Sequence, residues 1–258
     1  MTKDKGGLAG VTAGQSAIST VGEKGEGLHY RGYSIEQLAD KASFEEVAYL
    51  LLYRQLPTGQ TLATYQQKLI DLRFIPDVIK SVLKLIPKNT HPMDVLRTAC
   101  SMLGTLEPEN DFAQQYDIAD RLLAMFPGVI CYWYAYHYQG KELHGGSDEE
   151  SIGGHFLALL HGKAPTAVQR EMMNASLILY AEHEFNASTF AARVTAATLS
   201  DFYSAITTAI GTLRGPLHGG ANEAAMALIT RFKNPDEAAQ QLKQMLADKA
   251  KIMGFGHR

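Results

Sequence analysis

Hydrophobic residues recur at helical spacing along most of the chain after Ser34. Two capping boxes, in which a serine and a residue three positions later close the first turn of a helix, are predicted at Ser34 with Gln37 and at Ser43 with Glu46. The second box opens a helix with a broad apolar face. That face is formed by Val47, Leu50, Leu51 and Leu52.

The remaining boundaries follow from capping residues and prolines. Thr58 is placed to cap a helix that runs to about residue 73. Pro76, Pro87 and Pro92 are interpreted as boundaries, because the residue before a proline is biased away from the helical conformation. Further helices are predicted at about 92–105, 115–138, 151–161, 166–184, 188–199, 201–213, 221–231 and 235–250. Short connections between so many helices indicate a densely packed all-α fold.

One segment near the N-terminus has β character. Residues 17–21 partly alternate between apolar and polar side chains, and residues 22–27 are rich in glycine and charged turn residues. Residues 28–33 are then able to run back beside the first segment, which predicts a small hairpin.

Composition narrows the class of protein. The 258 residues are 46% hydrophobic and 20% charged, with a formal net charge of −3 and no basic stripe, which argues against nucleic-acid binding. No apolar run reaches the roughly 18 residues of a membrane span, and the N-terminus lacks the apolar core of a signal peptide, so we expect a cytoplasmic protein. Cys100 and Cys131 lie in apolar stretches and are expected to be buried, reduced thiols.

The segment from Arg214 to Asn222 interrupts the helical pattern, with Gly215 and Pro216 before His218 and Gly219 and Gly220 after it. It is the best domain boundary in the sequence. We expect a large helical domain over residues 1–219 and the beginning of a smaller domain over residues 220–258.

His218 is the first candidate for chemistry. It precedes a helix predicted to begin near Ala221, and the positive end of that helix disfavours a protonated imidazole. A neutral imidazole is able to donate a hydrogen bond to a developing enolate oxygen. The alternative is a glycine pair that ends one helix, with a histidine that is adjacent by chance.

His257 is flanked by Gly254 and Gly256, with Lys251 six residues upstream. Small residues let backbone N–H groups face a ligand. A simple turn before another element is the alternative. His155 and His161, on one apolar helix, are interpreted as structural.

His183 lies in a polar cluster, residues 182–189, after an apolar segment over residues 172–180 that we expect to be buried. Buried polar groups need partners. Asn186 or Ser188 is suited to cap the next helix, which is the structural alternative, and a metal site built from Glu182, His183 and Glu184 is a third interpretation. Dinucleotide-binding, P-loop and nucleophile-elbow motifs are absent from the sequence.

The three histidine segments, 35 and 39 residues apart in an all-α chain, resemble those of the citrate synthase family. Within that family the resemblance is greatest to the bacterial 2-methylcitrate synthases. The matching segments are 182–189, 215–222 and 254–257, supported by residues 30–33, 56–58 and 91–93. The implied fold is a citrate synthase-like large helical domain with the small hairpin and the start of a small domain.

The resemblance also implies roles for individual residues. His218 would hydrogen-bond to the carbonyl oxygen of an acyl-CoA, and His257 would polarise the keto group of oxaloacetate. His183 and Arg73 would contact oxaloacetate. The loop expected to hold CoA consists of Lys251, Ile252, Met253, Gly254, Phe255 and Gly256. No metal and no cofactor are expected, because the CoA thioester is itself a substrate.

The implied reaction joins propionyl-CoA, and also acetyl-CoA, to oxaloacetate, giving 2-methylcitrate or citrate. A homodimer is expected, with no nucleic-acid or membrane partner. The catalytic aspartate of the family lies beyond the His257 motif, so these 258 residues are expected to be inactive alone. The alternatives are a citrate synthase proper, a non-catalytic remnant that dimerises or binds a dicarboxylate, and a metal-dependent hydrolase.

Overall fold

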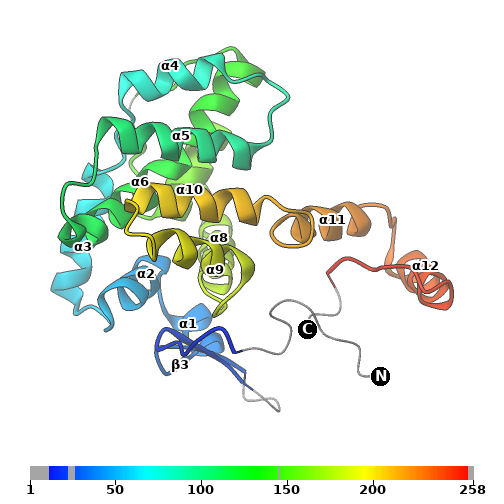
Figure 1. Ribbon diagram of the computed structural model, residues 1–258. Coiled ribbons are helices and arrows are strands. Elements are labelled where there is room, and N and C mark those ends of the chain that lie inside the picture. Colours follow the sequence, from blue (N-terminus) through cyan, green and yellow to red (C-terminus); the bar gives the residue numbers. More distant parts are fainter. Residues whose placement is uncertain (1–11, 23–26, 145, 255–258) are drawn as a thin grey trace.

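The computed structural model describes residues 12–22, 27–144 and 146–254 (Figure 1). The predicted hairpin is confirmed as part of a three-stranded antiparallel sheet in the order β1 (Ser19–Val21), β2 (Leu28–Tyr30) and β3 (Tyr33–Ser34). The third strand was not predicted. It forms because Arg31 and Gly32, with φ of 46° and 89°, reverse the chain directly after β2.

Helices make up the rest of the described fold, which confirms the all-α class. They are α1 (Ile35–Lys41), α2 (Phe44–Tyr53), α3 (Gly59–Asp71), α4 (Asp77–Leu85), α5 (Pro92–Leu106), α6 (Gln115–Tyr134), α7 (Ile152–His161), α8 (Ala167–Tyr180), α9 (Ala187–Ala196), α10 (Phe202–Leu213), α11 (Gly220–Ile229) and α12 (Pro235–Ala247). A short 3₁₀ helix at Phe112–Gln114 precedes α6, and a π-helical turn at Ala135–Gln139 follows it.

Three local expectations were wrong. Helix α4 was missed, because Pro76 lies just before its first residue and sets its start without preventing it. The helix expected to reach residue 184 ends at Tyr180, and Glu184 adopts a left-handed conformation with φ of 53°. At Ser34 half a capping box forms: Ser34 Oγ accepts from Gln37 N but donates to Glu36.

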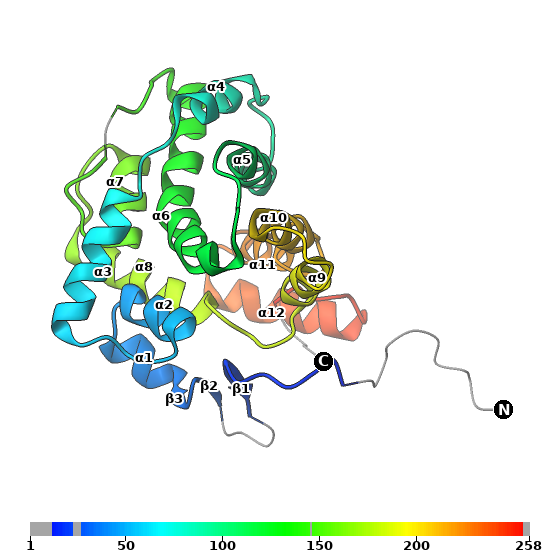
Figure 2. The ribbon, with the colours of Figure 1, turned by 60° about the vertical axis from the view of Figure 1, so that its left-hand side comes forward.

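The core consists of two apolar clusters that share α6. One lies among α4, α5, α6 and α10, and the other joins the sheet to α1, α2, α3, α7 and α8. Ala124 and Met125, adjacent residues of α6, belong to different clusters, so α6 passes between them (Figure 2). Both cysteines are buried free thiols.

Helix α8 differs from expectation. Its apolar segment was expected to be buried, but Ile178 is the one buried residue along this fully described helix. Met172 is 68% exposed and Tyr180 is 70% exposed. The helix is apolar on more than one side, and the rest of the chain covers one of them.

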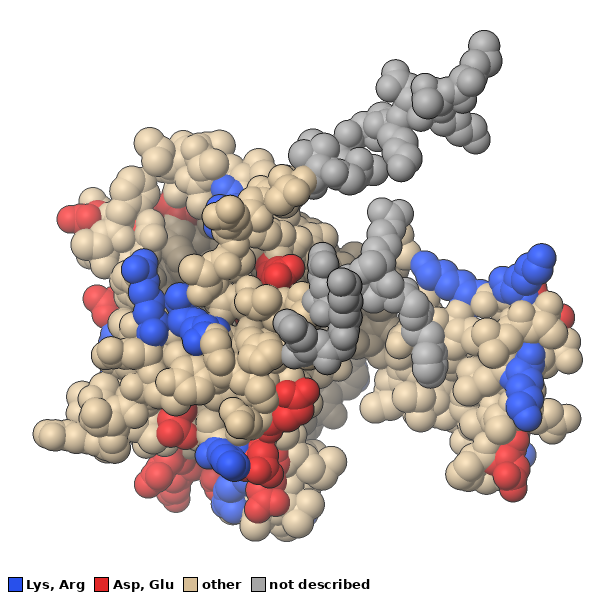
Figure 3. Space-filling view, turned by 90° about the horizontal axis from the view of Figure 1, so that it is seen from below, with Lys and Arg blue, Asp and Glu red and all other residues tan. Residues whose placement is uncertain are grey.

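Helices α11 and α12 project from the end of α10 as a separate lobe (Figure 1). The lobe begins where the second domain was expected to begin, although the division into domains stays a prediction. The face in Figure 3 shows acidic and basic side chains interspersed and no continuous basic stripe. Among the residues that the structure describes, no helix combines the length and apolar character needed to cross a membrane.

Candidate active site

His218 lies in the turn between α10 and α11, with its imidazole against the first turn of α9. The backbone N–H of Ser188 donates to His218 Nε2 over 3.2 Å, and Ser188 Oγ lies 2.8 Å from the same nitrogen. A backbone N–H is always a hydrogen-bond donor, so Nε2 must be the acceptor. The proton of the neutral imidazole is therefore on Nδ1. The turn thus holds a neutral imidazole in one tautomer.

Burial reinforces the neutral form, because it lowers the pKa of His218. The imidazole also precedes the start of α11, whose partial positive charge acts in the same direction. A neutral Nδ1–H is a hydrogen-bond donor at neutral pH that needs no prior protonation.

The glycines of this turn are required by close backbone packing. A Cβ on Gly219 would lie 2.5 Å from the carbonyl oxygen of Leu213, and one on Gly220 would lie 3.0 Å from that of Gly215. The N–H groups of His218 and Gly220 both donate to Gly215 O, over 3.0 and 3.1 Å. The glycines therefore serve the turn itself, which fixes the backbone of His218.

His183 lies between α8 and α9 and its residue is exposed. Asn186 caps α9 by accepting from Thr189 N over 3.0 Å, which confirms the cap alternative for that residue. His183 lies three positions before this cap, so the start of α9 brings the His183 and His218 segments together.

The carboxylates on either side of His183 are engaged with β1. Ser19 Oγ donates to Glu182 Oε1 over 2.9 Å, and Val21 N donates to Glu184 Oε1 over 3.1 Å. Across residues 12–22, 27–144 and 146–254, no group of three His, Cys, Asp or Glu side chains is arranged to hold a metal ion.

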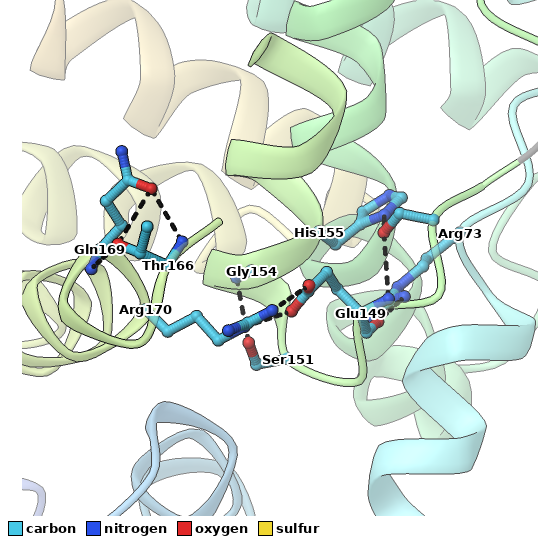
Figure 4. A network of polar contacts seen from close by, with 9 residues as sticks. Arg73, Glu149, Ser151, Gly154, His155, Thr166, Gln169 and Arg170 are labelled. Atoms are coloured by element: carbon cyan, nitrogen blue, oxygen red, sulfur yellow. Dashed lines mark hydrogen bonds and ion pairs between the residues drawn. The ribbon is translucent and has the colours of Figure 1, made fainter. Parts of the chain in front are cut away.

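Arg73 lies elsewhere, beside His155 (Figure 4). Its guanidinium donates to the carbonyl oxygens of Glu149 over 2.6 Å and Glu150 over 2.8 Å. Burial and the charge of Arg73 lower the pKa of His155 to about 4, and Ser147 Oγ lies 2.9 Å from His155 Nδ1. Arg73 and His155 line a cavity of about 480 Å³.

That cavity includes neither His183 nor His218. The structure therefore brings the segments that contain His183 and His218 together and places Arg73 outside that corner, while α3 and α11 lie on opposite sides of the molecule (Figure 1). A substrate contact by Arg73 stays a prediction.

The predicted CoA loop is described in part. Lys251, Ile252, Met253 and Gly254 follow α12, and a Cβ on Gly254 would lie 3.1 Å from Ala225 Cβ of α11. Phe255, Gly256 and His257 lie outside the described residues. The loop thus returns to the helix that follows His218.

A model of the citrate synthase family, described as "Citrate synthase, C-terminal domain", matches residues 7–258. A 2-methylcitrate synthase of Shewanella oneidensis is 59% identical over 97% of this chain and 67% of its own length. Citrate synthase 2 of Bacillus subtilis is 42% identical over 98% of this chain and 68% of its own length.

The chain belongs to the citrate synthase family. The crystal structure of citrate synthase from Thermotoga maritima superimposes with a TM-score of 0.85 at 36% identity, covering 98% of this chain and 67% of that one. A citrate synthase from Thermoplasma acidophilum, solved with carboxymethyl coenzyme A and oxaloacetate, gives 0.86 at 31% identity, over 96% of this chain and 66% of that one. The chain spans about two thirds of the length of these relatives.

Sequence reasoning missed several partners in this citrate synthase fold. Ser188 was considered as a helix cap, but Asn186 caps α9 and Ser188 contacts His218. Tyr30 and Ser19 contact the His183 segment from more than 140 residues away in sequence. The resemblance at residues 30–33 was the one signal that pointed to Tyr30.

Proposed function

We propose that the protein condenses a short-chain acyl-CoA with oxaloacetate and water, giving 2-methylcitrate or citrate and free CoA. The observation that carries the proposal is the neutral His218 imidazole, held by Ser188 with its proton on Nδ1. Membership of the citrate synthase family supports the same reaction class.

The chemistry requires simultaneous acid and base assistance, because a C–H beside a thioester carbonyl is a weak acid. A hydrogen bond from His218 Nδ1 stabilises the enolate oxygen as a carboxylate base removes the α-proton. The carbon nucleophile attacks the keto carbon of oxaloacetate, whose oxygen His257 polarises, and His183 binds a carboxylate of that substrate. Hydrolysis of the thioester then releases CoA from the loop over residues 251–256.

The resemblance to the family assigns no base among residues 1–258. The 258 residues alone are therefore expected to bind oxaloacetate without turnover. Calorimetry with oxaloacetate tests binding, and His183→Ala should weaken it. Wild-type chain that takes up no oxaloacetate would refute the proposed site, and turnover comparable to a full-length relative would refute the expected inactivity.

Propionyl-CoA is the proposed preferred thioester, supported by the 59% identical 2-methylcitrate synthase. One methyl group changes the free energy of binding by only ~1–3 kcal/mol, so acetyl-CoA is expected to react more slowly and not to be excluded. Comparing kcat/KM for the two thioesters, in a chain extended with the C-terminal third of a relative, decides the preference.

A homodimer is proposed from the uncovered apolar side of α8. The exposed apolar residues of that helix are Val168, Met172, Leu179 and Tyr180. Contiguous apolar surface of this kind marks association sites. Sedimentation equilibrium should give twice the chain mass for the wild type and a monomer for Met172→Glu; a monomeric wild type contradicts the proposal.

A non-catalytic dicarboxylate-binding protein is the second candidate. It predicts oxaloacetate binding of the 258 residues, as above, but no condensation after the C-terminal third of a relative is restored. The cytoplasmic location also stays a prediction.

A further inference from the structure

The His183 segment, between the end of α8 and the start of α9, is fixed by the N-terminal sheet. Residues 181–186 form no helix or strand. Their backbone N–H and C=O groups therefore need other partners if the segment is to keep one conformation. Ser19 and Tyr30, both in the small sheet, supply those partners.

Tyr30 has no exposed surface, and its hydroxyl reaches the last turn of α8 and the start of this connection. The hydroxyl donates toward the carbonyl oxygens of Ile178 over 3.0 Å and Glu182 over 3.1 Å. It accepts from the N–H of Glu182 over 3.2 Å. One phenol thus ties the last turn of α8 to the residue directly before His183.

Ser19 secures the other side. Its hydroxyl donates to Glu182 Oε1 over 2.9 Å and accepts from Glu184 N over 3.1 Å. Ser19 is 4% exposed and pairs directly with Tyr30 across β1 and β2, which places both side chains on one face of the sheet. The two hydroxyls therefore act on one segment together.

Two further observations show that the surrounding structure fixes the conformation of the His183 segment. Glu184 holds φ of 53°, a left-handed conformation that residues with a Cβ keep when their surroundings fix it. Arg31, the residue after Tyr30, donates to Leu51 O over 2.9 Å and anchors the sheet to α2. The sheet is thus attached to the helical body and to both neighbours of His183.

We infer that Ser19 and Tyr30 are positioning residues for oxaloacetate, because they fix the backbone on both sides of His183, the residue proposed to bind it. This inference rests on the proposed function. A ligand gains affinity when the protein group that binds it is already held in the bound orientation. The sheet holds the backbone around His183 in place, so the hydroxyls of Ser19 and Tyr30 act without touching the substrate.

The test compares Tyr30→Phe with a matched control, Tyr65→Phe, in the full 258-residue chain. Tyr65 is 4% exposed and lies in the same apolar cluster, and its replacement by Phe removes the hydrogen bond that it donates to Asp120 over 2.9 Å. Ser19→Ala removes the second hydroxyl, and Ser19→Thr keeps it. Calorimetry gives the Kd for oxaloacetate and, separately, for propionyl-CoA.

Tyr30→Phe and Ser19→Ala should each weaken oxaloacetate binding roughly fivefold to tenfold, because each removes the hydrogen bonds made by one hydroxyl. Tyr65→Phe and Ser19→Thr should stay within about twofold of the wild type, as should propionyl-CoA binding by every variant. Hydrogen exchange at the Glu184 amide should rise about tenfold in Ser19→Ala.

The outcomes separate the two proposals. Wild-type chain that binds no oxaloacetate overturns the proposed function and this inference with it. Oxaloacetate binding by the wild type that Tyr30→Phe and Ser19→Ala leave unchanged overturns the inference alone. An equal loss in Tyr65→Phe also overturns it, because the effect then belongs to general destabilisation of the core.

Discussion

Replacing His155 with asparagine should remove a large part of the acid sensitivity of the fold. His155 is 2% exposed, and burial together with Arg73 lowers its pKa from 6.5 to about 4. Asparagine is uncharged at every pH in this range, and its side-chain oxygen is able to take the place of Nδ1 beside Ser147. The substitution therefore removes the titration while keeping the local hydrogen bond.

The sign follows from proton binding. Between about pH 4 and 6.5 the unfolded chain binds a proton at His155 more readily than the folded chain, so stability falls as the pH falls. At ~1.36 kcal/mol per pH unit, this contribution is nearly complete at pH 7 and about 2 kcal/mol of it is lost by pH 5. About 3 kcal/mol is lost by pH 4.

Urea unfolding at pH 7 and pH 5 measures the effect. The free energy of unfolding of the wild type should decrease by about 2 kcal/mol more than that of His155→Asn. His161→Asn is the matched control, since His161 lies on the same helix but is exposed, and it should follow the wild type. If the free energy of unfolding decreases equally in the wild type and in His155→Asn, the folded protein does not hold His155 in its neutral form and the prediction is wrong.

Three further outcomes are expected. Asp120→Ala should destabilise the fold by roughly 3 kcal/mol, lowering Tm by several degrees, because it removes the buried partner of Tyr65 and Lys68; an unchanged Tm in calorimetry contradicts this. Gly219→Ala should lower Tm, since its Cβ would lie 2.5 Å from a backbone oxygen, and a wild-type Tm would show that the turn relaxes freely. Burial raises the pKa of the Cys131 thiol to about 12, so it should react with a disulfide reagent only after urea is added; rapid reaction of native protein argues against that burial.

The sequence predicted the elements more accurately than it predicted their partners. Helix starts with capping side chains, such as Ser43 and Thr58, were placed correctly because the cap is a local interaction. Helix α4 begins after Pro76 with no side-chain cap, and so it gave no local signal. The end of α8 was also missed, because the residues that follow it are held by the hydroxyls of Ser19 and Tyr30, which are distant in sequence.

The candidate site shows the same limit. The sequence singled out His183 and His218 as candidates through their surrounding motifs, but the tautomer of His218 depends on Ser188, thirty residues away. Likewise, the exposure of α8 could not be predicted, since an apolar helix gives the same pattern whether its own chain or a second chain covers it. Sequence motifs therefore indicate which residues are candidates for a site, whereas contacts between distant segments determine the protonation and orientation of those residues.

The position of His218 at the corner between α10 and α11 has a mechanical consequence. If the α11–α12 lobe rotates about residues 214–219, each atom is displaced in proportion to its distance from that axis, so α12 sweeps the longest arc and His218 the shortest. The contact of the imidazole with α9 further resists displacement. In the proposed mechanism, a hydrogen-bond donor near this axis would keep its orientation while the outer lobe moves, so opening the site to a bulky thioester would not misalign it.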